Sequence, residues 1–229
     1  MTRILAIETT TGLASVALLD GEQGYVRELP GVQTHSQGVL PAVQSLLAEA
    51  GVALADCDAI AFGCGPGAFT GIRTACGIVQ GLAYGAGLPV LPVVSLLAMA
   101  QAAREQQGGS EFVCVLDARM SEVYWAQYRY AAGGWQTVVE PLLSRPDEIP
   151  AALAPDLPLF VLGQGLDAAA LPPSTATLVC MPHALQVARL GRAAYEAGVR
   201  LSAEQAQPLY LRNKIALTTA ERMQLKPGR

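Results

Sequence analysis

The stretch GCGPGAFTGIR, residues 63–73, follows a buried strand predicted at Asp58–Gly63 and precedes a helix predicted at Gly71–Ala86. Four glycines in nine positions permit backbone conformations and close approaches that other residues forbid. Thr70 is predicted to cap the helix. The sequence therefore predicts a strand, a glycine-rich loop and a helix in immediate succession.

Two functions are open for this loop. The start of the helix offers free N–H groups and a positive dipole end, with Arg73 in its first turn, which suits an anion. It is not a Walker loop, because no Gly-Lys-Ser/Thr follows. The alternative is a tight strand-to-helix turn without a ligand.

The elements on either side complete a first lobe. Strands are predicted upstream at Ile4–Glu8, Ala14–Leu19 and Tyr25–Leu29, with a hairpin marked by Asp20 and Gly21. A capping box at Thr34 predicts a helix that contains Pro41 and ends at Gly51. A strand at Val90–Val94 and a helix at Ser95–Gln107 are predicted downstream, before the glycine-rich boundary at 108–110.

The opening pattern recurs after this boundary. Phe112–Asp117 is an apolar strand that ends in a carboxylate, and Glu122–Tyr130 is the next strand. We therefore expect Glu8 and Asp117 to occupy matching places beside one cleft. Two domains are predicted, an N-terminal lobe at 1–107 and a C-terminal lobe at 108–229. The remaining predictions are a short helix at 146–153, a strand at 159–162 and a last helix at 183–198, which is a candidate to pack back on the first lobe.

Composition narrows the function classes. Only 15% of the residues are charged against 52% hydrophobic, and the net charge of −4 gives no bulk attraction to nucleic acid. Five cysteines without CxxC spacing predict free thiols and a cytoplasmic location. No secretory leader is evident. The uncharged run between Arg73 and Arg104 is interrupted by Pro89 and Pro92, so we expect a buried helix, a turn and a strand rather than a membrane span.

A nucleotide site is one hypothesis for the cleft. Its candidate residues are Glu8, Thr10, Gly65, Gly67, Thr70 and Asp117. The alternatives are an ordinary polar turn after Glu8 and a structural ion pair between Asp117 and Arg119. No metal site is expected, because a helical pair needs a second ligand four residues after His35 and that residue is Val39. No catalytic residue is predicted, since no hydrolase triad motif occurs.

A partner surface is predicted on the first two helices. Gly77, Gly81 and Gly85 share one helix face, and three interior glycines suggest that another backbone packs very close. The candidate interface residues are Leu40, Val43, Leu47, Ile72, Cys76, Val79 and Ala83. Internal packing of these apolar faces is the alternative.

Five segments resemble, in order, the motifs of the TsaB (YeaZ-like) proteins of bacteria. They are ILAIETTTGLASVALLDG, THSQGVLPAV, AFGCGPGAFTGIRTACGIVQGLA, LDARMSEVYWAQY and PLYLRN. The resemblance covers nearly the whole chain. It implies an α/β fold of the actin-like ATPase type, with two related lobes that each have a mixed β-sheet flanked by helices. It also implies a role in forming N6-threonylcarbamoyladenosine at position 37 of tRNA.

The resemblance further implies a non-catalytic subunit. Its first two helices would dock on a larger TsaD-like catalytic subunit, and a TsaE-like P-loop ATPase would join the assembly. A homodimer is expected for the isolated chain, with tRNA reached only indirectly. No cofactor is expected on the chain alone, and ATP or ADP only within the complex. Glu8 stands where the family pattern has aspartate, and Val39 where the catalytic paralogue has its second metal ligand.

Two other functions are alternatives to this one. A free-standing nucleotide phosphotransferase or ATPase of the same fold would use Glu8, the threonines at 9–11 and the loop at 65–71. An inactive metallopeptidase homologue is the third, because such sequences have carried that label. A metal pair, a triad and a reactive Cys–His signature are all missing from the sequence.

Overall fold

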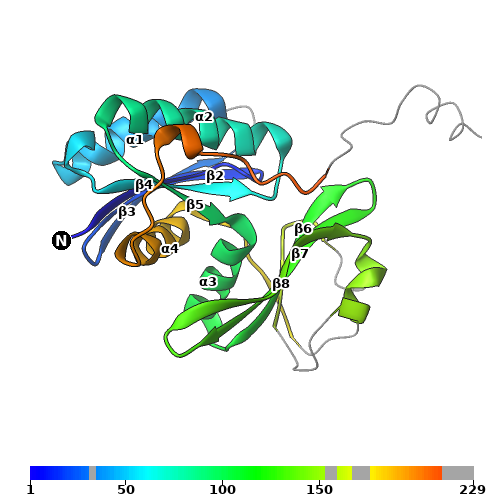
Figure 1. Ribbon diagram of the computed structural model, residues 1–229. Helices are drawn as coiled ribbons and strands as arrows, with labels where there is room; N and C mark the ends of the chain where they lie inside the picture. The colour runs from blue at the N-terminus through cyan, green and yellow to red at the C-terminus, as the bar shows by residue number, and fades with distance from the viewer. Residues whose placement is uncertain (31–34, 153–158, 167–175, 213–229) are drawn as a thin grey trace, which may run out of the picture.

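The computed structural model describes residues 1–30, 35–152, 159–166 and 176–212. These residues form two lobes, and each lobe is built on a five-stranded mixed sheet (Figure 1). The chain passes between the lobes more than once, so neither lobe is a single continuous stretch of sequence.

The first sheet has the strand order β3-β2-β1-β4-β5. Its strands are β1 (Arg3–Glu8), β2 (Leu13–Asp20), β3 (Gln23–Pro30), β4 (Ala59–Gly65) and β5 (Val90–Val94). The first three form an antiparallel meander, while β4 runs parallel to β1 and β5 runs parallel to β4. Strand β1 is therefore central and is buried from its second residue onward.

Helices cover both faces of the first sheet. α1 (His35–Ala50) and α2 (Phe69–Ala86) lie side by side on one face, and α4 (Ala184–Glu196) lies on the other (Figure 1). Alternate β1 side chains divide between the two cores, with Leu5 facing α1 and α2 and Ile4 facing α4. This alternation is the period of a strand that is covered on both sides. The short helix η2 (Leu54–Asp56) precedes β4.

The second sheet repeats the first topology. Its order is β10-β9-β6-β7-β8, with β6 (Glu111–Arg119), β7 (Glu122–Ala131), β8 (Gly134–Ser144), β9 (Leu159–Leu162) and β10 (Thr177–Val179). α3 (Ser95–Gln107) packs on one face through Leu96, Met99 and Ala103. The opposite face is covered by η3 (Pro146–Ala152), whose Ile149 is fully buried. Helix α3 thus covers the second sheet, although it precedes the predicted boundary after residue 107.

The two sheets can be aligned by comparing β4, which runs parallel to the central strand β1, with β9, which runs parallel to the central strand β6. Phe62 pairs with Ile7, and Leu162 pairs with Val115. A Cβ added to the next residue, Gly63, would meet the Glu8 side chain. At the corresponding Gly163, an added Cβ would meet Leu116. The predicted internal repeat is therefore present, but Leu116 rather than Asp117 occupies the place of Glu8, and that detail of the prediction is wrong by one residue.

Most predicted elements are confirmed, with bounds that shift by one or two residues. β5 and α3 match their predicted ranges, and β9 matches the strand predicted at Leu159–Leu162. β8 and β10 were not predicted, because β8 is largely exposed and β10 has only three residues, so neither shows a clear apolar pattern. The capping box at Thr34 lies outside the described residues. No helix among those described is long and apolar enough to cross a membrane.

Candidate functional site: the cleft between the lobes

A cleft of about 530 Å³ lies between the two lobes. The first lobe contributes the turn at 10–12 and the start of α2, and the second contributes the β6–β7 turn and the glycine turn after β9. The segment at 209–212 lines it as well. The volume is within the range of small-molecule sites, so the chemistry of the lining decides what the cleft suits.

Glu8 does not reach this cleft. Its side chain is fully buried at the end of β1, where Oε1 accepts a hydrogen bond from the Thr10 backbone N–H at 2.6 Å. Oε2 accepts a second from the hydroxyl of Ser95, the first residue of α3, at 3.2 Å. Burial raises the pKa of the Glu8 carboxyl, while the hydrogen bonds from Thr10 and Ser95 oppose that rise. Glu8 therefore joins the β1–β2 turn to α3 instead of facing a ligand.

The glycines of the loop at 63–73 make room for this turn. A Cβ added to Gly67 would lie 2.3 Å from the Thr10 carbonyl oxygen, and one added to Gly71 would lie 2.0 Å from the Thr9 carbonyl oxygen. The Ala68 N–H donates to the Thr10 carbonyl at 2.7 Å, and the Thr9 hydroxyl donates to the Gly71 carbonyl at 2.7 Å. The close approach predicted for these glycines is thus made by the chain itself, which favours the interpretation of a tight strand-to-helix turn.

The start of α2 differs from the prediction. The helix begins at Phe69 with Ala68 as its N-cap and without a side-chain cap, so the capping role predicted for Thr70 is wrong. The Thr10 carbonyl takes the capping place by accepting the Ala68 N–H. Arg73 is also engaged within the chain, because its guanidinium stacks on the Phe69 ring at 3.6 Å and its Nε donates to the Tyr210 hydroxyl at 2.7 Å.

The β6–β7 turn is the second lobe's contribution to the cleft. Asp117 is exposed there and forms the predicted ion pair with Arg119 at 3.1 Å, while the Arg119 N–H donates to Asp117 Oδ1 at 2.8 Å. Arg119, Met120 and Ser121 have φ values of 64°, 58° and 58°. Three consecutive left-handed residues other than glycine are costly, so the turn needs support from its surroundings.

The predicted nucleotide residues are only partly brought together. Thr10, Gly67 and Asp117 line the cleft, whereas Glu8, Gly65 and Thr70 are not among its lining residues. A nucleotide-bound magnesium ion prefers carboxylate ligands beside the phosphates, and the first lobe's carboxylate is buried within the fold. Thr10 is fully buried, and its hydroxyl already donates to the Ser95 hydroxyl at 3.0 Å. The residues present therefore fit a magnesium nucleotide poorly.

The predicted interface residues mostly face inward. Among them Leu40 is exposed and Leu47 is half-buried, while the other five are buried: Val43, Ile72, Cys76, Val79 and Ala83. These five cannot contact a partner directly, and that part of the prediction is corrected. The physical reason is that the apolar stripe of a surface helix packs against the sheet beneath it and is therefore buried within the lobe.

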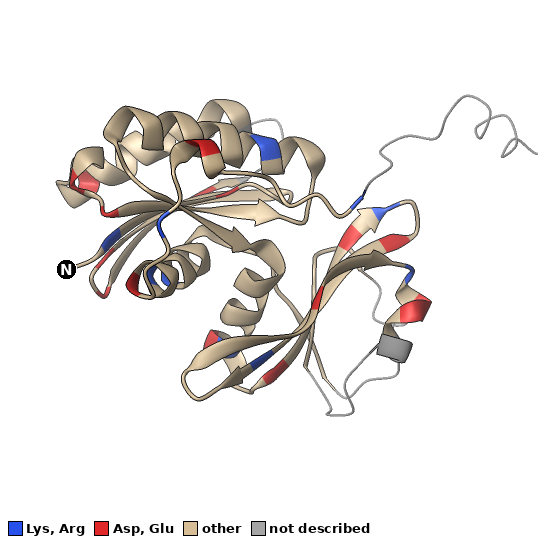
Figure 2. Cartoon of the chain, in the orientation of Figure 1, with Lys and Arg blue, Asp and Glu red and all other residues tan. Residues whose placement is uncertain are grey.

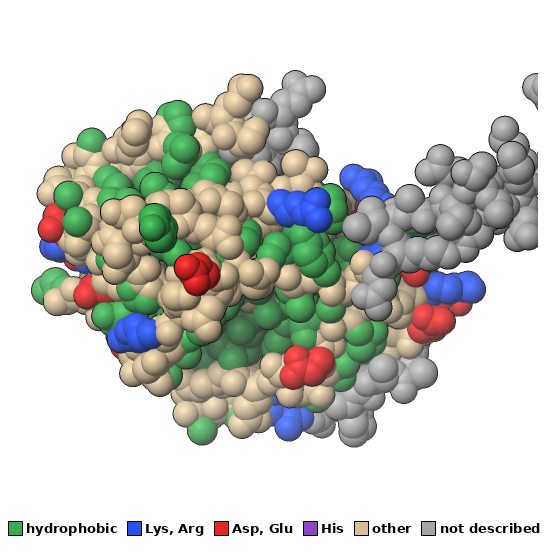
Figure 3. Space-filling view, turned by 45° about the horizontal axis from the view of Figure 1, so that its top comes forward, with side chains coloured by type: hydrophobic (Ala, Val, Ile, Leu, Met, Phe, Trp, Pro, Cys, Tyr) green, Lys and Arg blue, Asp and Glu red, His purple; other side chains and the backbone are tan. Residues whose placement is uncertain are grey.

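The outer faces of α1 and α2 form a surface of their own. We define the α1–α2 face by its exposed residues Leu40, Pro41, Gln44, Ser45, Ala48, Gly77, Gly81, Tyr84 and Gly85. An added Cβ at Gly77, Gly81 or Gly85 would meet nothing within 4 Å, so no backbone of the described residues packs against them. Tyr84 is 80% exposed. Figure 2 marks few charged residues along the two helices, because α1 contains only Glu49 and α2 only Arg73. Figure 3, in which the side that carries these helices comes forward, also shows few charged side chains there.

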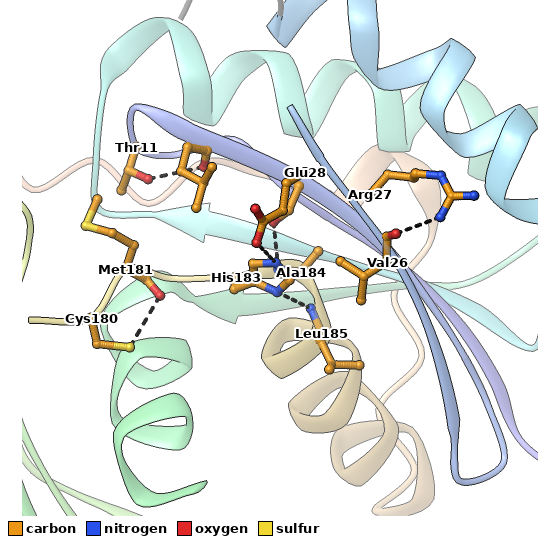
Figure 4. A network of polar contacts seen from close by, with 11 residues as sticks. Thr11, Val26, Arg27, Glu28, Cys180, Met181, His183, Ala184 and Leu185 are labelled. Atoms are coloured by element: carbon orange, nitrogen blue, oxygen red, sulfur yellow. Dashed lines mark hydrogen bonds and ion pairs between the residues drawn. The ribbon is translucent and has the colours of Figure 1, made fainter. Parts of the chain in front are cut away.

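The two histidines stand at the starts of different helices, α1 and α4. His35 is the first residue of α1, and Val39 is fully buried in the first core. His183 caps α4 by accepting the Leu185 N–H on Nδ1 at 3.2 Å, and its Nε2 lies 3.3 Å from Glu28 (Figure 4). Burial lowers the pKa of His183, and Glu28 partly opposes this shift. Within the described ranges, no three His, Cys, Asp or Glu side chains are grouped to hold a metal ion.

Sequence reasoning missed the segment at 206–212 as part of the cleft. Its Leu209 N–H donates to the Cys64 carbonyl at 2.7 Å, and its Arg212 guanidinium reaches the β6–β7 turn. The only signal was the short motif PLYLRN, which has no periodicity, and its described residues 208–212 form no helix or strand. Such a segment is recognisable only from its tertiary contacts.

Comparisons with known proteins agree with the fold. The family model for TsaD, tRNA N6-adenosine threonylcarbamoyltransferase, matches residues 27–214. A relative from Haemophilus influenzae, named tRNA threonylcarbamoyladenosine biosynthesis protein TsaB, is 38% identical over 224 residues, covering 93% of this chain and 94% of the relative. The protein of the same name from Escherichia coli is 37% identical over 223 residues, covering 93% and 96%.

A solved structure shows the same arrangement. The structure described as YeaZ from Pseudomonas aeruginosa matches with a TM-score of 0.85 and 39% identity, covering 92% of this chain and all of that one. The predicted actin-like α/β fold of two related lobes is confirmed.

Proposed function

The chain belongs to the TsaB (YeaZ-like) family of tRNA threonylcarbamoyladenosine biosynthesis proteins, and we propose that it is a non-catalytic cytoplasmic subunit that docks on and activates a TsaD-like catalytic partner. A role in that biosynthesis follows from the family. The docking and the lack of independent catalysis are the proposal.

The α1–α2 face carries this proposal. It combines exposed apolar side chains, Leu40 and Tyr84, with three glycines that have open space above them. Each interior glycine costs a helix up to about 1 kcal/mol relative to alanine, and none of the residues that the structure describes packs against these glycines to compensate for that cost. A partner helix lying against the glycine stripe would compensate for it, because small residues allow two backbones to approach closely. Tyr84 would then act as an aromatic anchor.

The interior of the first lobe supports the non-catalytic part. Glu8 and the Thr9 and Thr10 hydroxyls are engaged in hydrogen bonds that hold the β1–β2 turn to α2 and α3. We expect the isolated chain to bind no nucleotide by itself, with ATP or ADP binding only in the assembled complex. A TsaE-like ATPase is expected to join through the complex, and tRNA to be contacted mainly by the partner.

Gly81→Ala is the sharpest test of docking. The added methyl meets nothing in the isolated chain, so the variant should be more stable by about 0.5–1 kcal/mol. If a partner helix packs on the glycine stripe, the same methyl should weaken binding to the purified TsaD-like partner by about tenfold. Calorimetric unfolding and binding titration measure the two effects, and Tyr84→Arg should abolish binding with little loss of stability.

The matched control is Val138→Arg, which changes an exposed apolar residue of the second lobe. It should leave both binding and reconstituted tRNA modification unchanged. The docking proposal fails if Gly81→Ala and Tyr84→Arg bind the partner as the natural chain does. The isolated chain should also self-associate through the same face at high concentration, since an apolar face without its partner pairs with a copy of itself. Tyr84→Arg should then give a monomer.

A further inference from the structure

Three passages of the described chain connect the two lobes. The first is the junction of β5 and α3 at Ser95, and the second is the return from β10 to α4 at 180–184 (Figure 4). Both touch the β1–β2 hairpin: Ser95 bonds to Glu8 and Thr10, and the Ala184 N–H donates to the Ser15 hydroxyl at 2.9 Å. These two connections therefore meet at one place, and Gln186 and Arg189 of α4 also bind Glu105 of α3.

The third passage is the segment at 206–212, here called the strap. In Figure 1 it runs from above the first sheet to the β6–β7 end of the second. Its first part is anchored on α2, because the Ala206 carbonyl accepts from Gln80 Nε2 at 2.9 Å and from the Cys76 thiol at 3.1 Å. The bond from the Leu209 N–H to Cys64 adds an anchor at the end of β4. These contacts hold the strap to the first lobe.

Two side chains hold the strap to the second lobe: Leu211 packs against its hydrophobic core, and Arg212 binds the β6–β7 turn. Arg212 is mostly buried, and its Nη2 lies 2.6 Å from a carboxylate oxygen of Glu122 and donates to the Ala118 carbonyl at 3.0 Å. Its Nη1 lies 3.3 Å from the sulfur of Met120. Arg212 thus contacts residues within and on both sides of the turn at 119–121, in which all three residues have positive φ. A charge-assisted pair that also satisfies turn carbonyls is stronger than an exposed ion pair.

We propose that the strap is a clasp that sets the opening of the interlobe cleft, with Arg212 as its fastening point on the β6–β7 turn. The strap residues 209–212 line the cleft themselves, so release of Arg212 would both widen the cleft and uncover the part that these residues occupy. The strap's first anchor is on α2, whose outer face is part of the α1–α2 face. The clasp does not depend on the proposed docking, since all its contacts are within one chain.

The clasp is testable by measuring the distance between the lobes in the full chain. Ala55→Cys and Thr137→Cys place one spin label on an exposed residue of each lobe. All five natural cysteines are buried, and burial raises the pKa of Cys57 to about 11 and that of Cys64 to about 12, so their thiols react slowly. Dilution with unlabelled protein removes distances between copies. The natural chain should give one narrow distance peak.

Arg212→Ala should broaden that peak and shift it to longer distance. The matched control is Arg200→Ala, which removes an arginine that donates to the Tyr195 and Val199 carbonyls and stacks on the Tyr195 ring. That control should keep the natural distance peak. An unchanged distance distribution in Arg212→Ala would overturn the proposal.

A milder variant covers the case in which Arg212→Ala does not fold. Glu122→Gln weakens the ion pair but leaves the carbonyl contacts of Arg212 in place. Hydrogen exchange at the Leu209 amide then reports strap release, because that amide is protected only while it is bonded to Cys64. We expect exchange at Leu209 to accelerate by about tenfold while the amides of β1 stay protected. Equal protection at Leu209 in the natural chain and in Glu122→Gln would also count against the clasp.

Discussion

Glu8 and Leu116 occupy the same place in two lobes of the same topology. Each lies toward the end of a central strand and beside a glycine, Gly63 or Gly163. Both residues are buried: Glu8 is completely inaccessible to solvent, and Leu116 is 4% exposed. The fold therefore provides a buried position at this point, and one lobe fills it with leucine while the other fills it with a carboxyl.

The difference lies in what each turn does next. In the first lobe the turn folds inward over α2, and its N–H and hydroxyl groups are bonded to Glu8, Ser95 and Gly71. In the second lobe the turn projects into the cleft, where Asp117 is exposed and Arg212 supports the backbone. A carboxylate near a strand end thus has two unlike roles in two related lobes. Only the second is placed to meet a ligand.

The largest expected effect comes from separating the first turn from α2. Gly71→Ala would place a Cβ 2.0 Å from the Thr9 carbonyl, a backbone atom that cannot move aside. We expect a loss of about 3–5 kcal/mol in the free energy of unfolding, or failure to fold. Gly77→Ala, in the same helix with nothing within 4 Å, should stabilise the chain by up to about 1 kcal/mol. Denaturant unfolding of the pair measures both, and equal stabilities would show that the turn does not rest on α2.

The second prediction concerns Glu8→Leu, which places at Glu8 the residue type found at the corresponding position, Leu116, of the second lobe. Glu8→Leu removes the acceptor for the Thr10 N–H and for the Ser95 hydroxyl, both buried. Two unsatisfied donors should cost about 2–3 kcal/mol. Glu8→Gln keeps an acceptor of the same shape and should stay within about 1 kcal/mol of the natural chain. If Glu8→Leu were as stable as Glu8→Gln, the carboxyl would have no part in holding the turn.

The third prediction concerns the pH dependence of that carboxyl. Because burial raises the pKa of Glu8 in the folded chain, the folded state holds its proton more tightly than the unfolded state does. This contribution to stability is complete below the unfolded pKa of about 4.3 and is lost as the pH rises through the folded value. The stability of the natural chain relative to Glu8→Gln should fall in that window, with a slope of at most about 1.4 kcal/mol per pH unit. Parallel stability curves for the two proteins would contradict it.

The sequence predicted the elements with strong local signals. The paired meanders, α2 and α3 followed from apolar periodicity and from glycines at their ends. The glycine-rich loop was recognised as a place of close approach, but its residues alone could not identify what approaches. The carbonyls that meet Gly67 and Gly71 belong to Thr10 and Thr9, which are distant in sequence.

The site was less predictable for the same reason. Val79 and Tyr84 are both apolar residues of α2, yet one is fully buried and the other is 80% exposed. The sheet beneath the helix determines which side of the helix faces inward. The sequence of the helix alone therefore does not show which of its apolar residues are buried. The matching of Glu8 with Asp117 failed by one residue, because the second turn contains an irregularity between Asp117 and Arg119. The strap lacked any periodic signal.

The smallest expected effect is at the exposed carboxylate of the second lobe. Asp117→Asn keeps an oxygen that can accept the Arg119 N–H and removes only an exposed ion pair. Such pairs contribute little, so the free energy of unfolding should change by less than about 0.5 kcal/mol. The pH profile of stability should also keep its shape, because the buried Glu8 is untouched. A loss as large as that of Glu8→Leu would mean that Asp117 supports its turn as Glu8 does, and the two lobes would then differ less than their exposures indicate. A small loss, together with weaker tRNA modification in the reconstituted complex, would instead identify Asp117 as a residue that acts at the cleft.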